Sequence, residues 1–512
     1  MRVTLVHPNL HGEYSPSLGV TYVGTVLQRH GHEVKVLDFT GMKRHWMELL
    51  HRHVRSFQPE VVGFSVLSFN VRDALVMSVE LKRVDPEVVT LFGGVHATLA
   101  PGELLERPEV DAACTGEGEE TVPKFLEALG GGGATSLPDV AGVWYKKKLE
   151  GRGNRGTSRT RENRGEEVVR NPPRPVVADL DALPFPNWDL WDNFDRYLDF
   201  MQFEGELPVL ASRGCPYSCS FCSNHRLRRL MPGPPVRVRS PANVVEEVGY
   251  QLEKYGDRVK VAYFWDENFF GNRREAFEEF CRLYVAAGLH ERVRWSCNVR
   301  ADAIDRDWAE TARRAGCFHV RFGVESGNEV VRNAVLNKGL SDEVVFRARR
   351  VLREADLLCR ANFILGAPGE TVETMRQTLR FVRELDPDFY FLSVFQPLPG
   401  TRVLDLVERL GGRIEVDKWQ SSTNFWSTAS VDTKYLRARD VERFRRRAYL
   451  RGALEFLLRG LREHPLRFWL DALHFFREYY LKRGAYLLKL ATFTVGRYEV
   501  AKWLARSQGQ IS

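Results

Sequence analysis

Short apolar runs alternate with segments of helical spacing along residues 1–145. Runs of this length, rich in valine and ending at polar or glycine residues, are typical of buried strands and occur at 3–6, 34–38, 61–66, 88–92 and 111–114. The segments between them, such as 18–29 and 45–57, repeat apolar residues at the spacing of one helix face. The pattern predicts an α/β fold, a doubly wound parallel sheet with helices on both faces.

Polar and glycine residues follow these strands. In a doubly wound sheet, ligands bind at the edge formed by the carboxyl ends of the strands. The segments expected at that edge are 7–10, 65–69, 93–96 and 115–120. We therefore expect residues 1–145 to form a ligand-binding domain.

The strand–helix alternation stops at residues 146–207. Up to residue 174 this segment is polar and shows no apolar period, which predicts a mobile hairpin tip or linker. Prolines and large aromatic residues follow at 179–189 and predict a strap between two domains.

Alternation returns over residues 208–420, where apolar runs occur at 209–212, 261–265, 293–296, 319–323, 360–364 and 388–392. Six strands with helices between them predict a partial βα barrel of the TIM type. Such barrels carry their chemistry at the carboxyl ends of the strands.

Residues 421–512 predict a helical C-terminal region in which aromatic residues alternate with arginines, as at 449–459 and 468–476. A basic amphipathic helix can lie on an anionic membrane. Peripheral contact with the inner face of a membrane would suit a lipid-like substrate. Packing of the same stripes over the barrel mouth is the alternative.

The composition is that of a globular protein, with 44% hydrophobic and 28% charged residues. A length of 512 residues predicts two or three domains. Eight cysteines, five of them scattered singly through a long chain, do not suit a disulfide scaffold, and no apolar run is long enough to predict a membrane span. We expect a protein of the reducing cytoplasm, with no nucleic-acid partner.

Three cysteines on one loop carry the most specific signal. Cys215, Cys219 and Cys222 follow a predicted strand with the spacing C-x3-C-x2-C. Three thiolates can hold three irons of a four-iron cluster and leave the fourth iron open for a ligand. A closed zinc site takes four ligands, commonly in C-x2-C pairs, but no second pair occurs here and His225 would close a strained loop.

This motif, with Phe221 before the last cysteine, resembles the radical SAM superfamily. The resemblance implies a [4Fe–4S] cluster on the three cysteines and S-adenosylmethionine at the open iron. It also implies reductive cleavage to a 5′-deoxyadenosyl radical, with the electron supplied by an external donor of the flavodoxin or ferredoxin type. Further matching segments follow the later strands in order, at 264–270, 298–302, 321–327, 362–370 and 396–401.

The resemblance also assigns contacts with S-adenosylmethionine. Arg300 and Glu325 are expected to meet its polar groups, and Phe221 and Ile364 to border its adenine. Further contacts are expected from strand-end polar residues, namely Asp266, Asn268 and Asn298. In this chain 266–268 reads Asp-Glu-Asn, where the family often has Gly-Gly-Glu.

The ends of the first set of strands resemble the cobalamin-binding domain that precedes many radical SAM domains, through the motifs at 93–98 and 115–121. Glycine lets backbone approach a buried flat ligand closely. The resemblance implies cobalamin contacts from Ser65, Leu67, Ser68, Gly93, Gly94, Val95, His96, Thr115, Gly116, Glu117 and Gly118. The D-x-H-x-x-G signature is absent, so a bound cobalamin is expected to lack a histidine lower ligand. Alternatively, this sheet serves only as a scaffold.

Together the two resemblances predict a cobalamin-dependent radical SAM enzyme that methylates an unactivated carbon of a small-molecule or lipid-like substrate. The same class includes the anaerobic oxidative cyclase of bacteriochlorophyll synthesis. A cyclase or rearrangement enzyme that transfers no methyl group is therefore the alternative.

Overall fold

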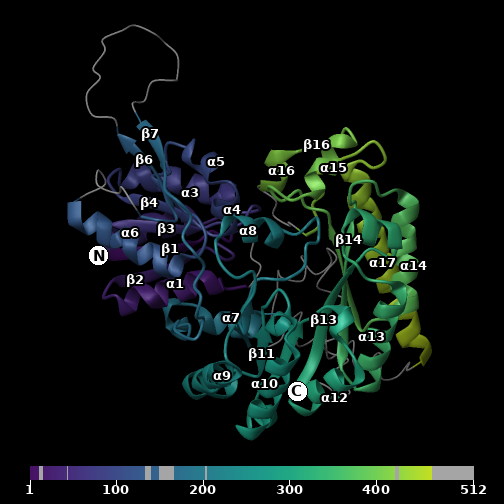
Figure 1. Ribbon diagram of the computed structural model, residues 1–512. Helices are drawn as coiled ribbons and strands as arrows, with labels where there is room; N and C mark the ends of the chain where they lie inside the picture. Colours follow the sequence, from purple (N-terminus) through teal and green to yellow (C-terminus); the bar gives the residue numbers. More distant parts are fainter. Residues whose placement is uncertain are drawn as a thin grey trace. The chain divides into compact units, whose positions relative to one another are not determined.

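The computed structural model describes residues 1–10, 15–42, 44–132, 140–148, 166–201, 205–420 and 426–463 (Figure 1). The chain divides into two compact units. The first comprises Met1–Leu283, Leu398–Leu404 and Val416–Phe425, and the second comprises Tyr284–Pro397, Asp405–Glu415 and Trp426–Ser512. None of the described helices is long and apolar enough to cross a bilayer.

A sheet in the order β2-β1-β3-β4-β5-β6-β7 dominates the start of the first unit, drawn in purple and blue in Figure 1. Its first five strands are parallel: β1 (Arg2–His7), β2 (Glu33–Asp38), β3 (Val61–Ser65), β4 (Val89–Gly93) and β5 (Ala112–Cys114). This order reverses direction between β1 and β3, which is the switch point of a doubly wound sheet. The predicted α/β class is confirmed.

The hairpin of β6 (Val143–Lys148) and β7 (Glu166–Arg170) extends this sheet in antiparallel fashion. The sheet therefore continues past residue 145, into the segment for which the sequence predicted a hairpin tip or a linker. The polar residues of this hairpin are compatible with a strand at the edge of a sheet, where one row of side chains meets water.

Helices cover both faces of the first sheet. The hydroxyl of Ser17 accepts a hydrogen bond from the amide of Val20 (3.3 Å) and caps α1 (Leu18–Arg29). Helix α1 packs beside α6 (Gly118–Gly132), and α2 (Trp46–Phe57) packs beside α3 (Val71–Val84). Crossovers between parallel strands are right-handed, so helices on either side of the switch point lie on opposite faces.

The segment 171–201, which we call the strap, is fastened to the first sheet and to α9 (Pro241–Tyr255). The indole of Trp191 donates to the hydroxyl of Thr21 (2.9 Å), and the hydroxyl of Tyr197 donates to Asp38 (2.7 Å). At the other side, the amide of Gln251 donates to the carbonyl of Pro186 (2.8 Å). The strap therefore holds two parts of the first unit together.

The first unit also contains the beginning of the second alternating region. Strand β8 (Glu206–Val209) pairs in parallel with β11 (Val261–Phe264), and the short β9 (Ser212–Arg213) pairs antiparallel with β10 (Arg237–Val238). Between β9 and β10 lies helix α8 (Asn224–Leu230), and α10 (Arg274–Ala286) follows β11.

The second unit contains four parallel strands: β12 (Arg294–Asn298), β13 (Cys317–Glu325), β14 (Leu358–Leu365) and β15 (Phe389–Val394). The helices between them are α12 (Arg306–Arg314), α13 (Asp342–Glu354) and α14 (Val372–Leu385). Five of the six strands predicted after residue 208 are present near their predicted bounds, whereas the first, β8, ends at Val209, where its predicted counterpart 209–212 begins.

Helix α17 (Ala438–Glu463) covers the edge strand β15. The guanidinium of Arg445 donates to the carbonyl of Leu392, and the amide of Leu392 donates to the hydroxyl of Tyr449 (2.8 Å). These groups satisfy the open hydrogen bonds of an edge strand. In this part of the tail, arginine and aromatic residues thus serve packing, and the apolar segment 468–476 lies outside the described residues.

Candidate active site

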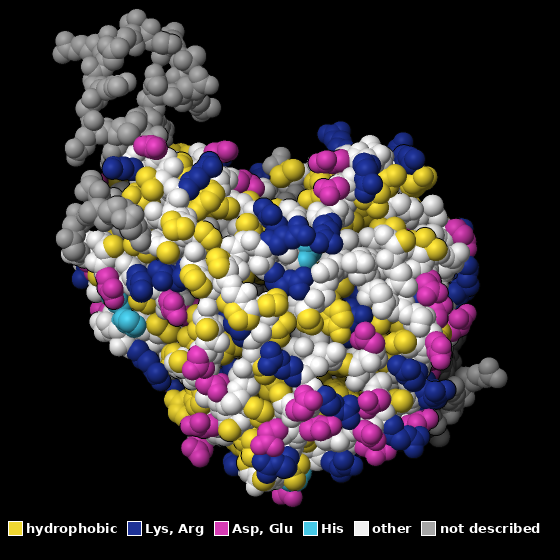
Figure 2. Space-filling model, viewed as in Figure 1, with side chains coloured by type: hydrophobic (Ala, Val, Ile, Leu, Met, Phe, Trp, Pro, Cys, Tyr) yellow, Lys and Arg dark blue, Asp and Glu magenta, His cyan; other side chains and the backbone are white. Residues whose placement is uncertain are grey.

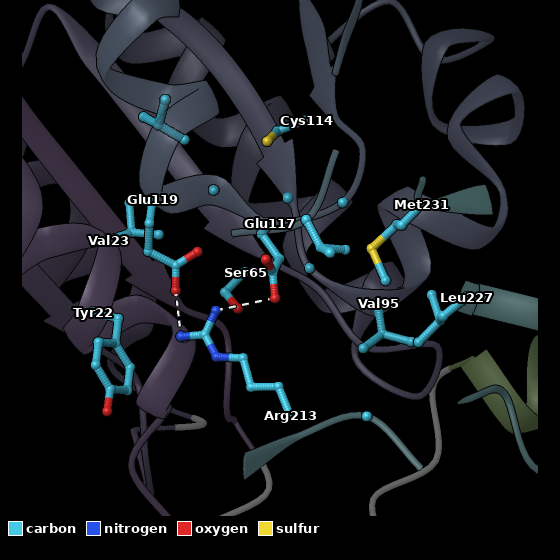
Figure 3. A pocket seen from close by; sticks show the side chains of 18 of the residues that line it. Tyr22, Val23, Ser65, Val95, Cys114, Glu117, Glu119, Arg213, Leu227 and Met231 are labelled. Atoms are coloured by element: carbon cyan, nitrogen blue, oxygen red, sulfur yellow. Dashed lines mark hydrogen bonds and ion pairs between the residues drawn. The ribbon is translucent and has the colours of Figure 1, made fainter. Parts of the chain in front are cut away.

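The carboxyl ends of the parallel strands open onto a cavity of about 410 Å³ in the first unit. Ser65, Gly93 and Cys114, the last residues of β3, β4 and β5, border it, and Figure 3 labels Ser65 and Cys114. Apolar side chains from the sheet, α1 and α6 continue its wall, namely Leu5, Val20, Val23, Leu91 and Val122. The cavity is an apolar slot at the edge where doubly wound sheets bind their ligands.

Gly94 allows two strand-end loops to pack closely at this edge. Its φ is +97°, and a Cβ there would lie 2.8 Å from the carbonyl oxygen of Val66. The amide of Val66 donates to the carbonyl of Gly93 (2.8 Å), and the amide of His96 donates to the carbonyl of Val66 (3.1 Å). Glycine at position 94 is therefore required by the fold itself.

Gly93 tests whether the cavity suits a flat cofactor. A Cβ at this position would meet only the Cβ of Cys114, at 3.8 Å, so packing within the protein does not require glycine here. The free space beside Gly93 belongs to the cavity instead. A glycine that keeps a slot open is what the nucleotide tail of cobalamin requires, and the residues present fit that group.

Most residues predicted to contact cobalamin border the cavity: Ser65, Gly93, Gly94, Val95, Gly116, Glu117 and Gly118. The cavity wall does not include Leu67, Ser68, His96 or Thr115. His96 is buried, with Nδ1 3.1 Å from the hydroxyl of Ser68, and burial lowers its pKa. The hydroxyl of Thr115 donates to the carbonyl of Gly142 (3.1 Å). Ser68, His96 and Thr115 thus support the loops from behind.

Residues 214–222, which we call the cysteine loop, begin at the same cavity. Gly214 and the neighbouring Asn224 border it. Gly214 has φ +89°, and a Cβ there would lie 2.2 Å from the carbonyl oxygen of Pro235. The residue before the first cysteine must therefore be glycine.

Arg228 of α8 holds the cysteine loop in shape. Its guanidinium donates to the carbonyls of Cys215 (3.2 Å) and Pro216 (2.9 Å) and to the hydroxyl of Ser218 (2.9 Å). Burial, followed by the nearby thiols of Cys219 and Cys215, raises the pKa of Cys222 to about 12. Ligation by a cation would supply the charge that stabilises such buried thiolates.

The three thiols of the cysteine loop are the candidate cluster ligands. Across the described ranges up to residue 463, no three His, Cys, Asp or Glu side chains converge closely enough to hold one metal ion. A four-iron cluster places each cysteine on a different iron, so its three thiolates stand apart from one another.

An ion-pair network joins β9, directly before the cysteine loop, to the start of α6. The guanidinium of Arg213 donates to Glu117 (3.1 Å) and Glu119 (2.6 Å), as Figure 3 shows. Arg237, opposite Arg213 in the β9–β10 pair, donates to both carboxylate oxygens of Glu117 (2.7 and 2.8 Å). Burial opposes ionisation of Glu117, but these two arginines lower its pKa. The glutamates of the Gly-Glu-Gly-Glu motif therefore fix the start of the cysteine loop.

After β11, alternate side chains are either buried in the protein or border the cavity. Asp266 and Asn268, both predicted to contact S-adenosylmethionine, are buried. Asp266 accepts from the amide of Ala211 (3.0 Å), and burial raises its pKa to about 7. Trp265 and Glu267 border the cavity instead. Because alternate residues of an extended segment face opposite sides, the odd-numbered positions reach the cavity here.

In the second unit, two predicted contacts of S-adenosylmethionine are linked by a lysine. Nζ of Lys338 lies 2.8 Å from Glu325, and the guanidinium of Arg300 donates to the carbonyl of Lys338 (3.0 Å) and pairs with Asp302. Glu325 has φ +71°, which is rare for a residue with a side chain. Such strained conformations cluster at functional sites. The sequence reasoning found Arg300 and Glu325 but missed Lys338.

Ile364 lies on the more open face of β14. It shares that face with Arg360 and Asn362, whose side chains are hydrogen-bonded at 3.0 Å, while alternate residues of the strand are buried. Asn298 ends β12 and is half-buried. Phe221, on the cysteine loop of the first unit, is also half-buried.

Two family models match the chain. The model of the B12 binding domain matches residues 11–126, and the model of the radical SAM superfamily matches residues 209–382. The first match covers the strand ends and α6 residues that border the cavity. The second covers the cysteine loop and the strands β11 to β14.

Relatives with both activities considered above are similar to this chain over most of its length. An uncharacterized methyltransferase of Pyrococcus horikoshii is 26% identical over 475 residues, which are 91% of this chain and 95% of the relative. The anaerobic magnesium-protoporphyrin IX monomethyl ester cyclase of Cereibacter sphaeroides is 30% identical over 431 residues, which are 81% of this chain and 64% of the cyclase.

A solved structure shares the fold. The radical S-adenosylmethionine methyltransferase TsrM of Kitasatospora setae, with cobalamin and a [4Fe–4S] cluster bound, matches with a TM-score of 0.63 and 23% identity over 81% of this chain and 80% of that one. Since both family models match and Gly214, beside the first cysteine, borders the glycine-lined cavity, the chain combines a B12 binding domain with a radical SAM domain.

Proposed function

We propose that this radical SAM enzyme uses cobalamin to methylate an unactivated carbon of a small-molecule or lipid-like substrate. One observation carries the proposal: loops from both cofactor-binding regions border a single cavity. Gly93 and Gly116 belong to the B12-binding domain. Arg213 directly precedes the cysteine loop in sequence, and Glu267 accepts a hydrogen bond from its first residue, Gly214. A shared cavity allows a methyl carrier and a radical source to act on one substrate atom.

The similarity to the methyltransferase of Pyrococcus horikoshii supports methylation, because it extends over 95% of that protein. The cyclase of Cereibacter sphaeroides is matched over a smaller share of its length, 64%. Oxidative cyclisation without methyl transfer is therefore the second candidate, supported by that similarity.

The cofactors supply the reactive groups when bound, a carbon radical and a transferable methyl group. The protein binds, orients and excludes water. We assign Cys215, Cys219 and Cys222 to the cluster and Arg300 and Glu325 to the polar groups of S-adenosylmethionine. The apolar walls of the cavity keep water away from reactive species.

We also assign Glu267 to S-adenosylmethionine, beside the role that the resemblance gave to Asp266 and Asn268. The Glu267 carboxylate opens onto the cavity and accepts from the amide of Gly214 (3.3 Å), next to the first cysteine. Desolvation raises the pKa of Glu267, and the hydrogen bond from Gly214 and the charges of Arg213 and Arg237 act against that shift. A carboxylate in this place can accept a hydrogen bond from an ammonium group.

The test follows the methyl group of S-adenosylmethionine rather than the unknown acceptor. The purified protein, reconstituted with iron, sulfide and cobalamin, is incubated with reductant and S-adenosylmethionine labelled in its methyl group. Mass spectrometry of the released cobalamin and of 5′-deoxyadenosine then reports both activities. The proposal expects label on cobalamin and formation of 5′-deoxyadenosine.

The Cys219→Ala variant serves as the control, since it removes one cluster ligand. It should form no 5′-deoxyadenosine. Wild-type protein that forms 5′-deoxyadenosine but never places label on cobalamin would favour the cyclase or rearrangement reading.

A further inference from the structure

Four arginines gather around the cysteine loop. Arg226, Arg228 and Arg229 lie on α8, and Arg402 lies on the segment Leu398–Leu404 of the same unit. We call these four the α8 arginine patch. Figure 2 shows dark-blue side chains gathered over this part of the surface, near the middle of the view.

Local contacts bring the two segments of the patch together. The amide of Val403 donates to the carbonyl of Ser220 in the cysteine loop (3.1 Å). Arg226 lies against Gly400, where a Cβ would be 3.1 Å from the Arg226 Nε.

The charge of the patch is not neutralised within the described structure. No carboxylate of the described residues forms an ion pair with any of the four guanidinium groups. Elsewhere in the first unit, arginines such as Arg213, Arg237 and Arg239 have acidic partners. Unpaired guanidinium groups gathered at a surface attract an anionic partner.

Most of the patch lies outside the lining of the cofactor cavity. Arg228 borders that cavity, but Arg226, Arg229 and Arg402 do not, and Arg229 and Arg402 are exposed. Anionic groups of a bound cofactor therefore do not account for these exposed charges. A partner that arrives from solution does.

We infer that the α8 arginine patch is the docking surface for an acidic electron-carrier protein. The inference rests on the proposed function, in which cleavage of S-adenosylmethionine is reductive. Arg228 hydrogen-bonds the backbone of the cysteine loop, and Val403 hydrogen-bonds it from the other segment, so the patch lies directly beside the cluster ligands. Electron transfer slows steeply with distance, so a donor must dock close to the cluster.

Each encounter transfers one electron and no atoms. The donor, a reduced flavin or iron–sulfur protein, is oxidised by one electron, and the cluster is reduced by one electron. Charge complementarity suits such a partner because redox encounters use small, short-lived interfaces that depend on electrostatic steering. Steering raises association rates by about 10-fold or more and weakens as salt screens the charges.

The test compares a protein donor with a small chemical reductant. The double variant Arg229→Gln/Arg402→Gln removes the two exposed charges without touching Arg228. A matched control, Arg29→Gln/Arg55→Gln, removes two exposed charges in the last turns of α1 and α2. Stopped-flow absorbance follows cluster reduction by a purified, reduced flavodoxin and, separately, by dithionite. Calorimetry measures flavodoxin binding to each protein.

We expect the patch variant to bind flavodoxin more weakly and to be reduced by it about 10-fold more slowly at low salt, with a flatter salt dependence. Reduction by dithionite and the control variant should match the wild type. Equal flavodoxin rates and affinities in patch variant and wild type would overturn the inference. A variant slowed equally with dithionite would also overturn it, because its arginines would then serve the cofactor site. Failure of the wild type to cleave S-adenosylmethionine with dithionite would instead count against the proposed function.

Discussion

Replacing Arg213 with methionine tests whether the ion-pair network holds the cysteine loop to the loop before α6. The Arg213 side chain is 16% exposed and that of Glu119 is 5% exposed. In the variant, Glu117 keeps its hydrogen bonds from Arg237, but Glu119 loses its cationic partner. Leaving one buried charge unpaired in this way destabilises a structure by about 3 kcal/mol.

The loss should appear as local opening. Since about 1.4 kcal/mol changes an equilibrium tenfold, opening of the two loops should increase by about 100-fold. Hydrogen exchange, read by mass spectrometry on peptides that cover 115–121 and 211–215, measures this change. The double variant Arg213→Met/Glu119→Gln leaves no buried charge without a partner, so both peptides should regain most of their protection from exchange.

Arg29→Met is the control, because Arg29 is exposed at the end of α1. Identical exchange of both peptides in wild type and Arg213→Met would show that the network does not hold the loops together. Equal exchange in the single and double variants would show that the stranded Glu119 charge is not the cause.

Three further predictions follow from the same structure. In Gly93→Val the added Cβ meets only the Cβ of Cys114, at 3.8 Å, and the side chain takes up space in the slot, so the variant should lose cobalamin on desalting, read by absorbance, while its iron content stays at the wild-type level. Gly102→Val, where an added Cβ meets nothing within 4 Å, should retain cobalamin, and retention by both variants would place the cofactor elsewhere. Burial raises the pKa of Glu370 to about 8, so the folded state keeps a proton that the unfolded state has lost, and the free energy of unfolding should fall as pH rises from about 4.5 to about 8. Denaturation across that range should show a weaker pH dependence in Glu370→Gln, and an unchanged dependence would refute the assignment. Cys219→Ala should lose the visible absorbance of the reconstituted cluster, and retention of a full complement of iron would contradict the ligand assignment.

Local patterns were sufficient to predict most elements of the fold. The helix Leu18–Arg29 matches its predicted bounds, because Ser17 caps it and its apolar spacing is regular. The sequence did not predict that the hairpin of β6 and β7 extends the sheet, because lysines and glutamates at a sheet edge lack the apolar signal of a buried strand.

The site was only partly predictable. The cysteine spacing and the strand-end glycines are local motifs, so the sequence exposes them directly. The pairing of Arg213 with Glu117 joins residues 96 positions apart, and no local pattern reports it. Trp265 and Glu267 could have been found, because alternation along the extended segment places them opposite the buried Asp266.

The central claim is that one chain holds both an iron–sulfur cluster and cobalamin. Anaerobic purification, reconstitution with iron, sulfide and hydroxocobalamin, and metal analysis after desalting test it most directly. The account predicts about four irons and about one cobalt per chain. Four irons without cobalt would contradict the cobalamin assignment and favour a cyclase or rearrangement, and zinc without iron would contradict the account as a whole.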